Sequence, residues 1–226
     1  MVAMYKIIGT GSKGNAVLLF GSILIDIGVR WKHLAPVAKD IKLVLLTHKH
    51  GDHFNRVCVS KLADENPLVR WVCCPWMEEL LLNAGVSPDR ITVLEPQTHN
   101  SPGGMARFKG FCTVRPERVK HDAANCCWHI IRELGADMNY SAFYCTDAES
   151  IEHVKAKNYR LYLIEANHTE EDIKARAKDK TAQGEYAYEF RAAHNHLSYE
   201  QANEWLMNNA ADYSDIVYLH QHIEEA

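Results

Sequence analysis

The segment Leu43 to His53 reads LVLLTHKHGDH, an apolar run followed at once by a loop with three histidines and one aspartate. A short run that is apolar on both faces is typical of a strand buried inside a layered sheet. We therefore expect the polar loop to lie at the carboxyl end of a buried strand. We therefore expect a layered fold with a buried sheet, and we expect the polar loop to lie at the edge of that sheet.

The spacing of the polar residues in this loop is that of a metal site. His48 and His50 are two residues apart and project to the same side of an extended segment, whereas Asp52 and His53 lie on the turn beyond Gly51. Imidazole and carboxylate together suit zinc, manganese or iron(II). A pair of such ions can hold a bridging hydroxide and clamp both oxygens of an in-line displacement. The loop therefore predicts part of a site for two divalent metal ions.

A dinuclear site needs more ligands than one loop supplies, and these are expected just after later strands. His121 with Asp122 follows one predicted strand, Asp147 ends a second, and His222 follows a third. His220 competes with His222 for the last position, and the two alternatives stay open. A single residue of this kind is more often a capping or surface residue, but their shared position at strand ends favours a ligand set.

The remaining pattern predicts strands and helices in alternation around these loops. Ser198, with Gln201 three residues later, has the spacing of a capping box at the start of a helix. Two mixed sheets with helices outside account for the order of elements, which gives a four-layer αββα sandwich in one domain over residues 1–226. The predicted strands lie within Met4 to Ile27 and at Leu43 to Leu46, Trp71 to Cys73, Ile91 to Leu94, Met105 to Phe108, Phe111 to Arg115, Trp128 to Glu133, Ser141 to Cys145, Leu161 to Ile164 and Ile216 to Leu219; the predicted helices are Phe54 to Asp64, Pro75 to about Gly85, Thr169 to Lys178 and Ser198 to Asn208.

Composition narrows the class of protein. The chain has 226 residues, a formal net charge of −4 and a pI near 6.3, so bulk electrostatics does not favour extended nucleic-acid binding. The seven cysteines have no CxxC spacing, which favours buried, reduced thiols over a disulfide framework. We find neither a signal-peptide pattern nor an apolar run long enough to cross a bilayer, so we expect a cytoplasmic protein without membrane contact.

Taken together, these residues resemble the successive motifs of the metallo-β-lactamase superfamily, whose members carry an αββα fold. The opening Gly11 to Asn15 segment, followed by Leu24 to Gly28, resembles the start of its small bacterial and phage phosphodiesterases and exonuclease-like members. The resemblance implies two divalent ions, zinc first, with manganese or iron as alternatives. It assigns His48, His50 and His121 to one ion, Asp52, His53 and His222 to the other, and Asp147 to a bridging position.

Two further motifs point to the ribonuclease Z-like phosphodiesterase branch. Glu165 and His196 resemble its paired residues, in which the glutamate orients a histidine that protonates the leaving oxygen. An imidazole held by a carboxylate suits this role near neutral pH. The resemblance thus implies hydrolysis of a phosphodiester by a metal-bridging hydroxide, with Asp52 helping to orient the nucleophile. The competing interpretation is that Glu165 caps a helix and His196 begins one.

The sequence predicts the substrate less directly than it predicts the metal site. A compact acidic chain without the long arm by which tRNA-processing members grip tRNA favours a small phosphodiester, and the resemblance extends to phage enzymes that degrade cyclic-nucleotide defence signals. The alternatives are a metal-dependent nuclease on single-stranded DNA or RNA and a catalytically inactive binding module with the same fold. Related small phosphodiesterases pair, so a homodimer is a further expectation. The basic stretch Arg107 to Lys120 is interpreted either as a steering surface for phosphate or as a solvated face.

Overall fold

The computed structural model describes residues 4–133, 139–171, 173 and 195–220. It divides into two compact units, Met1–Ala106 and Arg107–Ala226, each with its own sheet and its own apolar core. The expectation of a single domain over residues 1–226 stays a prediction. Within the described residues, no helix is long and apolar enough to cross a membrane.

The first unit contains a six-stranded sheet in the order β1-β2-β3-β4-β5-β6. Strands β1 to β3 pair antiparallel through short turns, and β3 to β6 pair parallel. Parallel neighbours require a crossover, and the helices α2 and α3 provide two of these connections. The strands are β1 (Tyr5–Gly9), β2 (Ala16–Leu19), β3 (Ile23–Ile25), β4 (Leu43–Leu45), β5 (Arg70–Cys73) and β6 (Ile91–Val93); the helices are α1 (Trp31–Leu34), η1 (Ala35–Asp40), α2 (Arg56–Glu65), α3 (Pro75–Asn83) and η2 (Pro88–Arg90).

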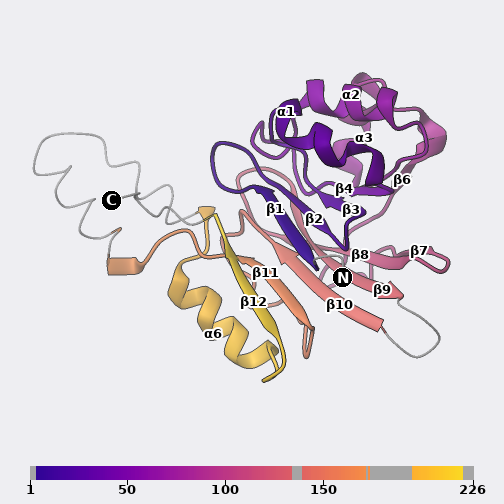
Figure 1. Cartoon of the computed structure of the whole chain (residues 1–226). Helices are drawn as coiled ribbons and strands as arrows, with labels where there is room; N and C mark the ends of the chain where they lie inside the picture. The colour runs from indigo at the N-terminus through magenta and orange to yellow at the C-terminus, as the bar shows by residue number, and fades with distance from the viewer. Residues whose placement is uncertain (1–3, 134–138, 172, 174–194, 221–226) are drawn as a thin grey trace, which may run out of the picture. The chain divides into compact units, whose positions relative to one another are not determined.

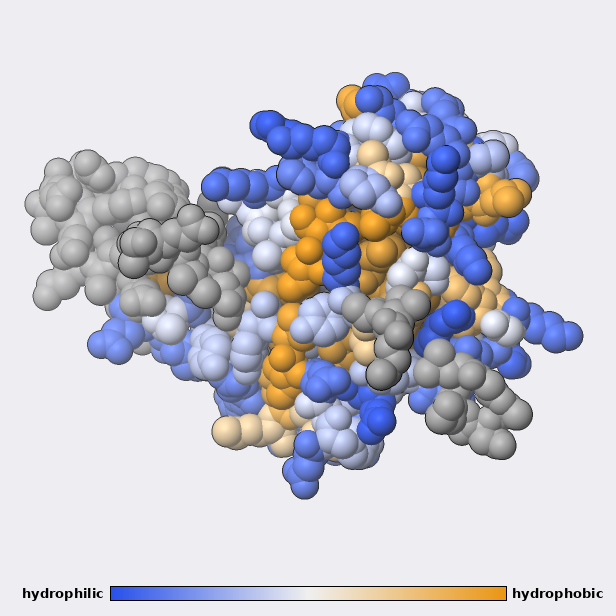
Figure 2. Space-filling view, in the orientation of Figure 1, coloured by the Kyte–Doolittle hydropathy of each residue, from blue (hydrophilic) through white to orange (hydrophobic). Residues whose placement is uncertain are grey.

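Strand β4 is fully buried, as its uninterrupted apolar run predicts. Helix α2 starts at Arg56, after the loop of residues 46–55, and the side chain of Asn55 accepts a hydrogen bond from the Cys58 backbone N–H. Pro75 occupies the first turn of α3, as expected from its fixed φ. The helices turn their apolar residues into the core of this unit, and hydrophilic residues dominate the surface over α1 to α3 (Figure 2).

The second unit contains the other six-stranded sheet, in the order β12-β11-β10-β9-β8-β7 (Figure 1). Strands β8 to β10 pair antiparallel, whereas β10, β11 and β12 run parallel. Helix α6 begins with the predicted capping box, because Ser198 and Gln201 each bond the backbone N–H of the other. The strands are β7 (Ala106–Phe108), β8 (Cys112–Val119), β9 (Asn125–Glu133), β10 (Asn139–Cys145), β11 (Leu161–Glu165) and β12 (Asp215–Leu219); helix α6 is Tyr199–Asn209.

The structure confirms the mixed α/β class with two sheets, and it corrects several boundaries. The short helix α1 was not predicted, because four residues are too few to show helical periodicity. Strand β8 continues past the predicted end at Arg115 to Val119, so His121 follows the strand almost directly. The predicted helix Thr169 to Lys178 extends beyond the described residues. All seven cysteines are buried thiols, as the sequence predicts.

Candidate metal and catalytic residues

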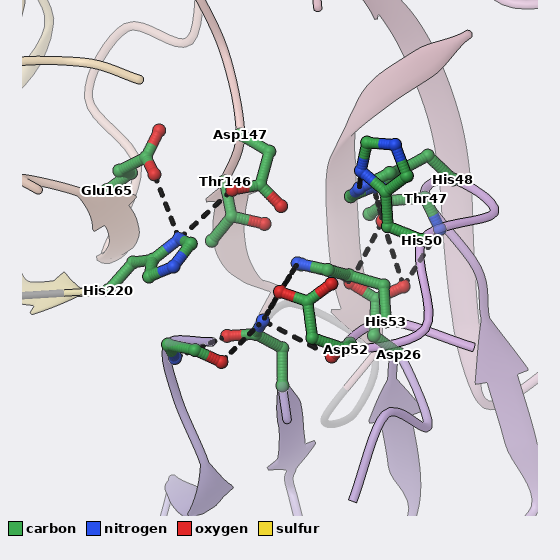
Figure 3. A network of polar contacts seen from close by, with 12 residues as sticks. Asp26, Thr47, His48, His50, Asp52, His53, Thr146, Asp147, Glu165 and His220 are labelled. Atoms are coloured by element: carbon green, nitrogen blue, oxygen red, sulfur yellow. Dashed lines mark hydrogen bonds and ion pairs between the residues drawn. The ribbon is translucent and has the colours of Figure 1, made fainter. Parts of the chain in front are cut away.

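In the first unit, the predicted ligands follow β4 in a loop that ends where α2 begins (Figure 3). The side chains of His48 and His53 are buried, and the Nε2 atom of His48 lies 3.1 Å from Nδ1 of His50. Two imidazole nitrogens at this separation face each other, as two ligands of one cation do. Among the predicted ligands of this unit, these two therefore form a first pair of donor atoms.

Asp26 fixes the orientation of the loop, a role that no local sequence pattern predicts. Its buried carboxylate accepts hydrogen bonds from the backbone N–H of Thr47 at 2.9 Å and from Nδ1 of His53 at 2.7 Å. The Thr47 hydroxyl also donates to Asp26, at 2.9 Å, and therefore accepts from Nδ1 of His48 at 3.0 Å. Both imidazoles thus carry their proton on Nδ1, which leaves the Nε2 lone pairs to bind a cation.

Asp52 and His53 form a second pair of candidate donors, because Nε2 of His53 lies 3.8 Å from Oδ2 of Asp52. The amide Nδ2 of Asn15 is 2.8 Å from the first of these atoms and 3.4 Å from the second. The partially positive amide N–H of Asn15 therefore contacts both Nε2 of His53 and Oδ2 of Asp52. This arrangement fits a cation ligand set, in which an ion would take the place of the amide contact.

The second unit gathers its candidate residues at the carboxyl ends of the three parallel strands. Asp147 follows β10, Glu165 ends β11, and His220 follows β12 (Figure 3). Neighbouring parallel strands end at the same edge of a sheet, so residues far apart in sequence meet there. Asp147, Glu165, His196 and His220 each place one donor atom within 4.8 Å of the others.

Hydrogen bonds hold this cluster in a defined geometry. Nδ1 of His196 donates to Oε1 of Glu165 at 2.7 Å and lies 3.1 Å from Oδ1 of Asp147. Nδ1 of His220 lies 3.0 Å from both of those oxygens. The other oxygen of Glu165 accepts from the backbone N–H groups of Ala148 and Leu197. Glu165 therefore positions two imidazoles and the segment before α6, rather than only capping a helix.

The charges in the cluster shift its ionisation. Burial alone would lower the pKa of His196, but hydrogen bonds and attraction from Asp147 and Glu165 raise it to about 10. The same groups raise the pKa of His220 to about 9 against the effect of burial. Burial opposes ionisation of Glu165, yet the two imidazoles lower its pKa. Metal ligation requires neutral imidazole, so a cation bound here would replace these protons.

The backbone at three of these positions has a conformation that side-chain residues rarely adopt. Asp26, Asp147 and His220 have φ values of 58°, 54° and 57°, in the left-handed region. Each follows a strand end, where the left-handed residue turns the chain sharply and directs a polar side chain to the sheet edge. Such strained residues persist where surrounding contacts fix them, and they cluster at functional sites.

Other predicted residues have simpler surroundings. His121 lies in the turn between β8 and β9, with Nε2 3.1 Å from Asp122 and Nδ1 3.3 Å from the carbonyl oxygen of Asn195. His222 lies outside the described residues, whereas the competing His220 is buried within the acidic cluster. The described candidates thus lie at or after the ends of strands, except His196, which lies just before α6, and their roles as ligands remain predictions.

The basic stretch before His121 has ion-pair partners. Arg107 lies 3.0 Å from Glu133 and Lys120 lies 2.8 Å from Glu149. His129 is held by Glu117, and His153 donates to the carbonyl oxygen of Arg118. These contacts support the interpretation of the stretch as a solvated, charge-paired face.

Comparison with solved structures identifies the fold. The chain matches the short form of human tRNase Z with a TM-score of 0.70 at 14% identity, covering 96% of this chain and 92% of that one. It matches the metallo-β-lactamase fold protein YhfI from Bacillus subtilis with a TM-score of 0.64 at 13% identity, covering 97% and 86%. No family sequence model and no curated protein sequence matches the chain. The chain therefore has the metallo-β-lactamase fold, which confirms the predicted fold class.

Proposed function

We propose that this chain is a metal-dependent phosphodiesterase, and that its substrate is a small phosphodiester such as a cyclic nucleotide. The observation that carries the proposal is the hydrogen bond of 2.7 Å between Glu165 and His196, within a cluster of carboxylates and imidazoles. The fold alone would not carry it, because one fold hosts many activities. Human tRNase Z, by its name a tRNA nuclease, supports phosphodiester chemistry by analogy only.

The donor chemistry of both units fits divalent cations. In the proposal, His48, His50 and His121 would hold one ion, Asp52 and His53 would serve the other, and Asp147 would be shared by both. His220 takes the remaining position in preference to His222, because its buried imidazole lies 3.0 Å from Asp147. Zinc is proposed first, with manganese and iron(II) as alternatives. Bound ions of this kind lower the pKa of a water and stabilise negative charge on phosphate oxygens.

The protein's own residues handle the proton. Glu165 is fully buried and holds Nδ1 of His196, so Nε2 is the imidazole nitrogen that carries a proton for the departing oxygen. The side chain of His196 is 21% exposed, which leaves it within reach of a substrate. Glu165 thus positions the proposed proton donor, and Asp52 is proposed to orient the attacking water.

Two alternatives remain from other classes. A nuclease acting on single-stranded DNA or RNA would use the same residues. The choice between a nuclease and a small-molecule enzyme therefore depends on which other residues contact the substrate. An inactive binding module would tolerate the loss of its ligand residues, yet every predicted ligand and catalytic position of this chain carries a His, Asp or Glu side chain. This retention favours an enzyme over the module.

The test is turnover of a panel of 3′,5′-cyclic nucleotides beside single-stranded DNA and RNA oligonucleotides, with zinc or manganese added. The His50→Ala protein is the control for contaminating activity. Cleavage of cyclic nucleotides alone supports the proposal in full, and cleavage of oligonucleotides alone moves the assignment to a nuclease. Absence of metal-dependent hydrolysis on the whole panel would refute the phosphodiesterase proposal.

A further inference from the structure

A second polar feature of the first unit lies outside the candidate ligands. It is a pocket of about 440 Å³ between the glycine-rich loop after β1 and the segment that follows β3. Its lining combines exposed polar side chains with backbone and small apolar groups. The lining residues are Ile8, Gly9, Thr10, Lys13, Gly14, Val29, Arg30 and His33.

The charge of this pocket is one-sided. Lys13, Arg30 and His33 are exposed, and no acidic residue is part of the lining. Within the described residues, neither Lys13 nor Arg30 forms an ion pair with an acidic side chain, so both charges face the pocket without a neighbouring counter-charge in its lining. Cations held together without a counter-charge create a local positive potential that attracts anions, even on a chain with a net negative charge.

Backbone packs directly against backbone in the wall of the pocket. A Cβ atom on Gly9 would lie 2.4 Å from the carbonyl oxygen of Gly14, and one on Gly14 would lie 2.5 Å from that of Gly28. Gly14 also has a φ of +129°, which favours glycine. Glycine is therefore required at positions 9 and 14, and Lys13 directly precedes one of these close backbone contacts.

The pocket adjoins the predicted ligand loop within the same unit. Gly14 lines the pocket, and the next residue, Asn15, is buried with its amide 2.8 Å from Nε2 of His53. On the opposite wall, Gly28 precedes Val29 and donates its N–H to the carbonyl oxygen of Asn15. Lys13 is two residues from Asn15, and Arg30 is two residues from Gly28. Since an extended chain spans at most about 3.6 Å per residue, each of these pairs of Cα atoms is no more than about 7 Å apart.

We propose that this pocket binds a phosphate group of the substrate other than the one that is cleaved. Arginine and lysine recognise phosphate oxygens through charge-assisted hydrogen bonds, and the adjacent ligand loop is where the scissile phosphate is proposed to bind. The inference rests on the proposed function and refines it. Within the proposed class of small phosphodiesters, it selects those with at least two phosphates, either a cyclic dinucleotide or a short linear nucleotide chain.

The direct test is binding of a fluorescein-labelled DNA tetranucleotide, followed by fluorescence anisotropy in EDTA so that no turnover occurs. The Lys13→Ala/Arg30→Ala protein should bind about tenfold more weakly or worse, with a shallower salt dependence, because two phosphate contacts are lost. Lys32→Ala is the matched control, since Lys32 is an exposed lysine on α1 outside the pocket lining. Its affinity should stay within about twofold of the wild type. Equal affinity of the double variant and the wild type, or no binding by the wild type, overturns the proposal.

Competition and hydrolysis complete the test. Displacement of the probe by an unlabelled cyclic dinucleotide identifies the cyclic source of the second phosphate, and displacement by linear dinucleotide alone identifies the linear one. With metal restored, the double variant should hydrolyse bis(4-nitrophenyl) phosphate, which has a single phosphate, at the wild-type rate. An equal loss on this substrate would mean that the pocket serves the scissile phosphate, which contradicts the inference. If the wild type hydrolyses nothing, the proposed function fails while the binding result still decides the role of the pocket.

Discussion

The two units differ in how the sequence supplies the residues of their polar clusters. In the first, the candidate donors His48, His50, Asp52 and His53 follow one another in a single loop after β4. In the second, Asp147, Glu165 and His220 come from three strands, and His220 follows Asp147 by 73 positions in the sequence. A contiguous motif shows its chemistry in the sequence, whereas the second cluster exists only once β10, β11 and β12 lie parallel.

If both clusters serve one metal-dependent activity, removing a ligand from either should have the same, largest effect. His50→Ala and Asp147→Ala should each lower bound metal and reduce turnover by more than about 10²-fold, since even outer contacts of metal ligands contribute 10- to 100-fold. Metal analysis and kinetics on the same preparations measure both effects. Full activity in either variant would remove that unit from the site.

The C-terminal histidine sharpens the comparison, because two residues compete for one role. His220→Ala should lower metal content by one ion per chain, whereas His222→Ala should leave it unchanged, since the buried His220 lies 3.0 Å from Asp147. Atomic emission analysis of the two matched variants distinguishes them. The reverse result would transfer the ligand role to His222.

Within the second cluster, His196 should behave differently from the ligands. His196→Ala should keep its metal while kcat falls about 10²-fold, because a general acid is lost. A substrate with a good leaving group, such as a 4-nitrophenyl ester, should lose less activity than a nucleotide ester. Loss of metal in this variant would instead make His196 a ligand.

In the first unit, Asp26 should have a smaller, indirect effect. Asp26→Asn keeps the size of the side chain but weakens the bonds to His53 and Thr47 that fix the imidazole protons. Metal affinity should fall about 10- to 100-fold while saturating metal restores turnover. Titration with a chelator buffer measures the affinity, and an unchanged value would show that Asp26 is needed only for folding.

The smallest effects are expected at the helix caps that follow each cluster. Asn55→Ala before α2 and Ser198→Ala before α6 should each lower the free energy of unfolding by about 1 kcal/mol, because each side chain satisfies a backbone N–H group. Urea denaturation measures the change. Metal content should stay at the wild-type level, and its loss would show that the cap also positions ligands.

The same contrast explains what could be predicted from sequence. The buried run Leu43 to Leu46 and the histidines after it indicated strand, loop and chemistry together, because all three depend on local order. Asp26 was visible as a polar residue after an apolar strand, but its bond to His53 depends on the pairing of β3 with β4. Glu165 likewise contacts His220 only because β11 pairs with β12, which no local pattern encodes.

The pocket lined by Lys13, Arg30 and His33 was harder to foresee for a similar reason. The glycines before Asn15 explained a tight turn equally well, and Arg30 and His33 stood in a segment without recognisable periodicity. Their grouping follows from the close backbone contact between Gly14 and Gly28. Local sequence therefore revealed contiguous chemistry, and tertiary pairing assembled the rest.

The proposed metal ligands are side chains of the loop after β4 and of the strand ends in the second unit. The most direct test of this assignment is the metal content of the full-length protein after loading with zinc or manganese and removal of unbound ions, measured by inductively coupled plasma mass spectrometry. Two ions per chain are expected in the wild type and fewer in His50→Ala. A wild-type protein that retains no divalent ion would contradict the assignment of these residues as ligands.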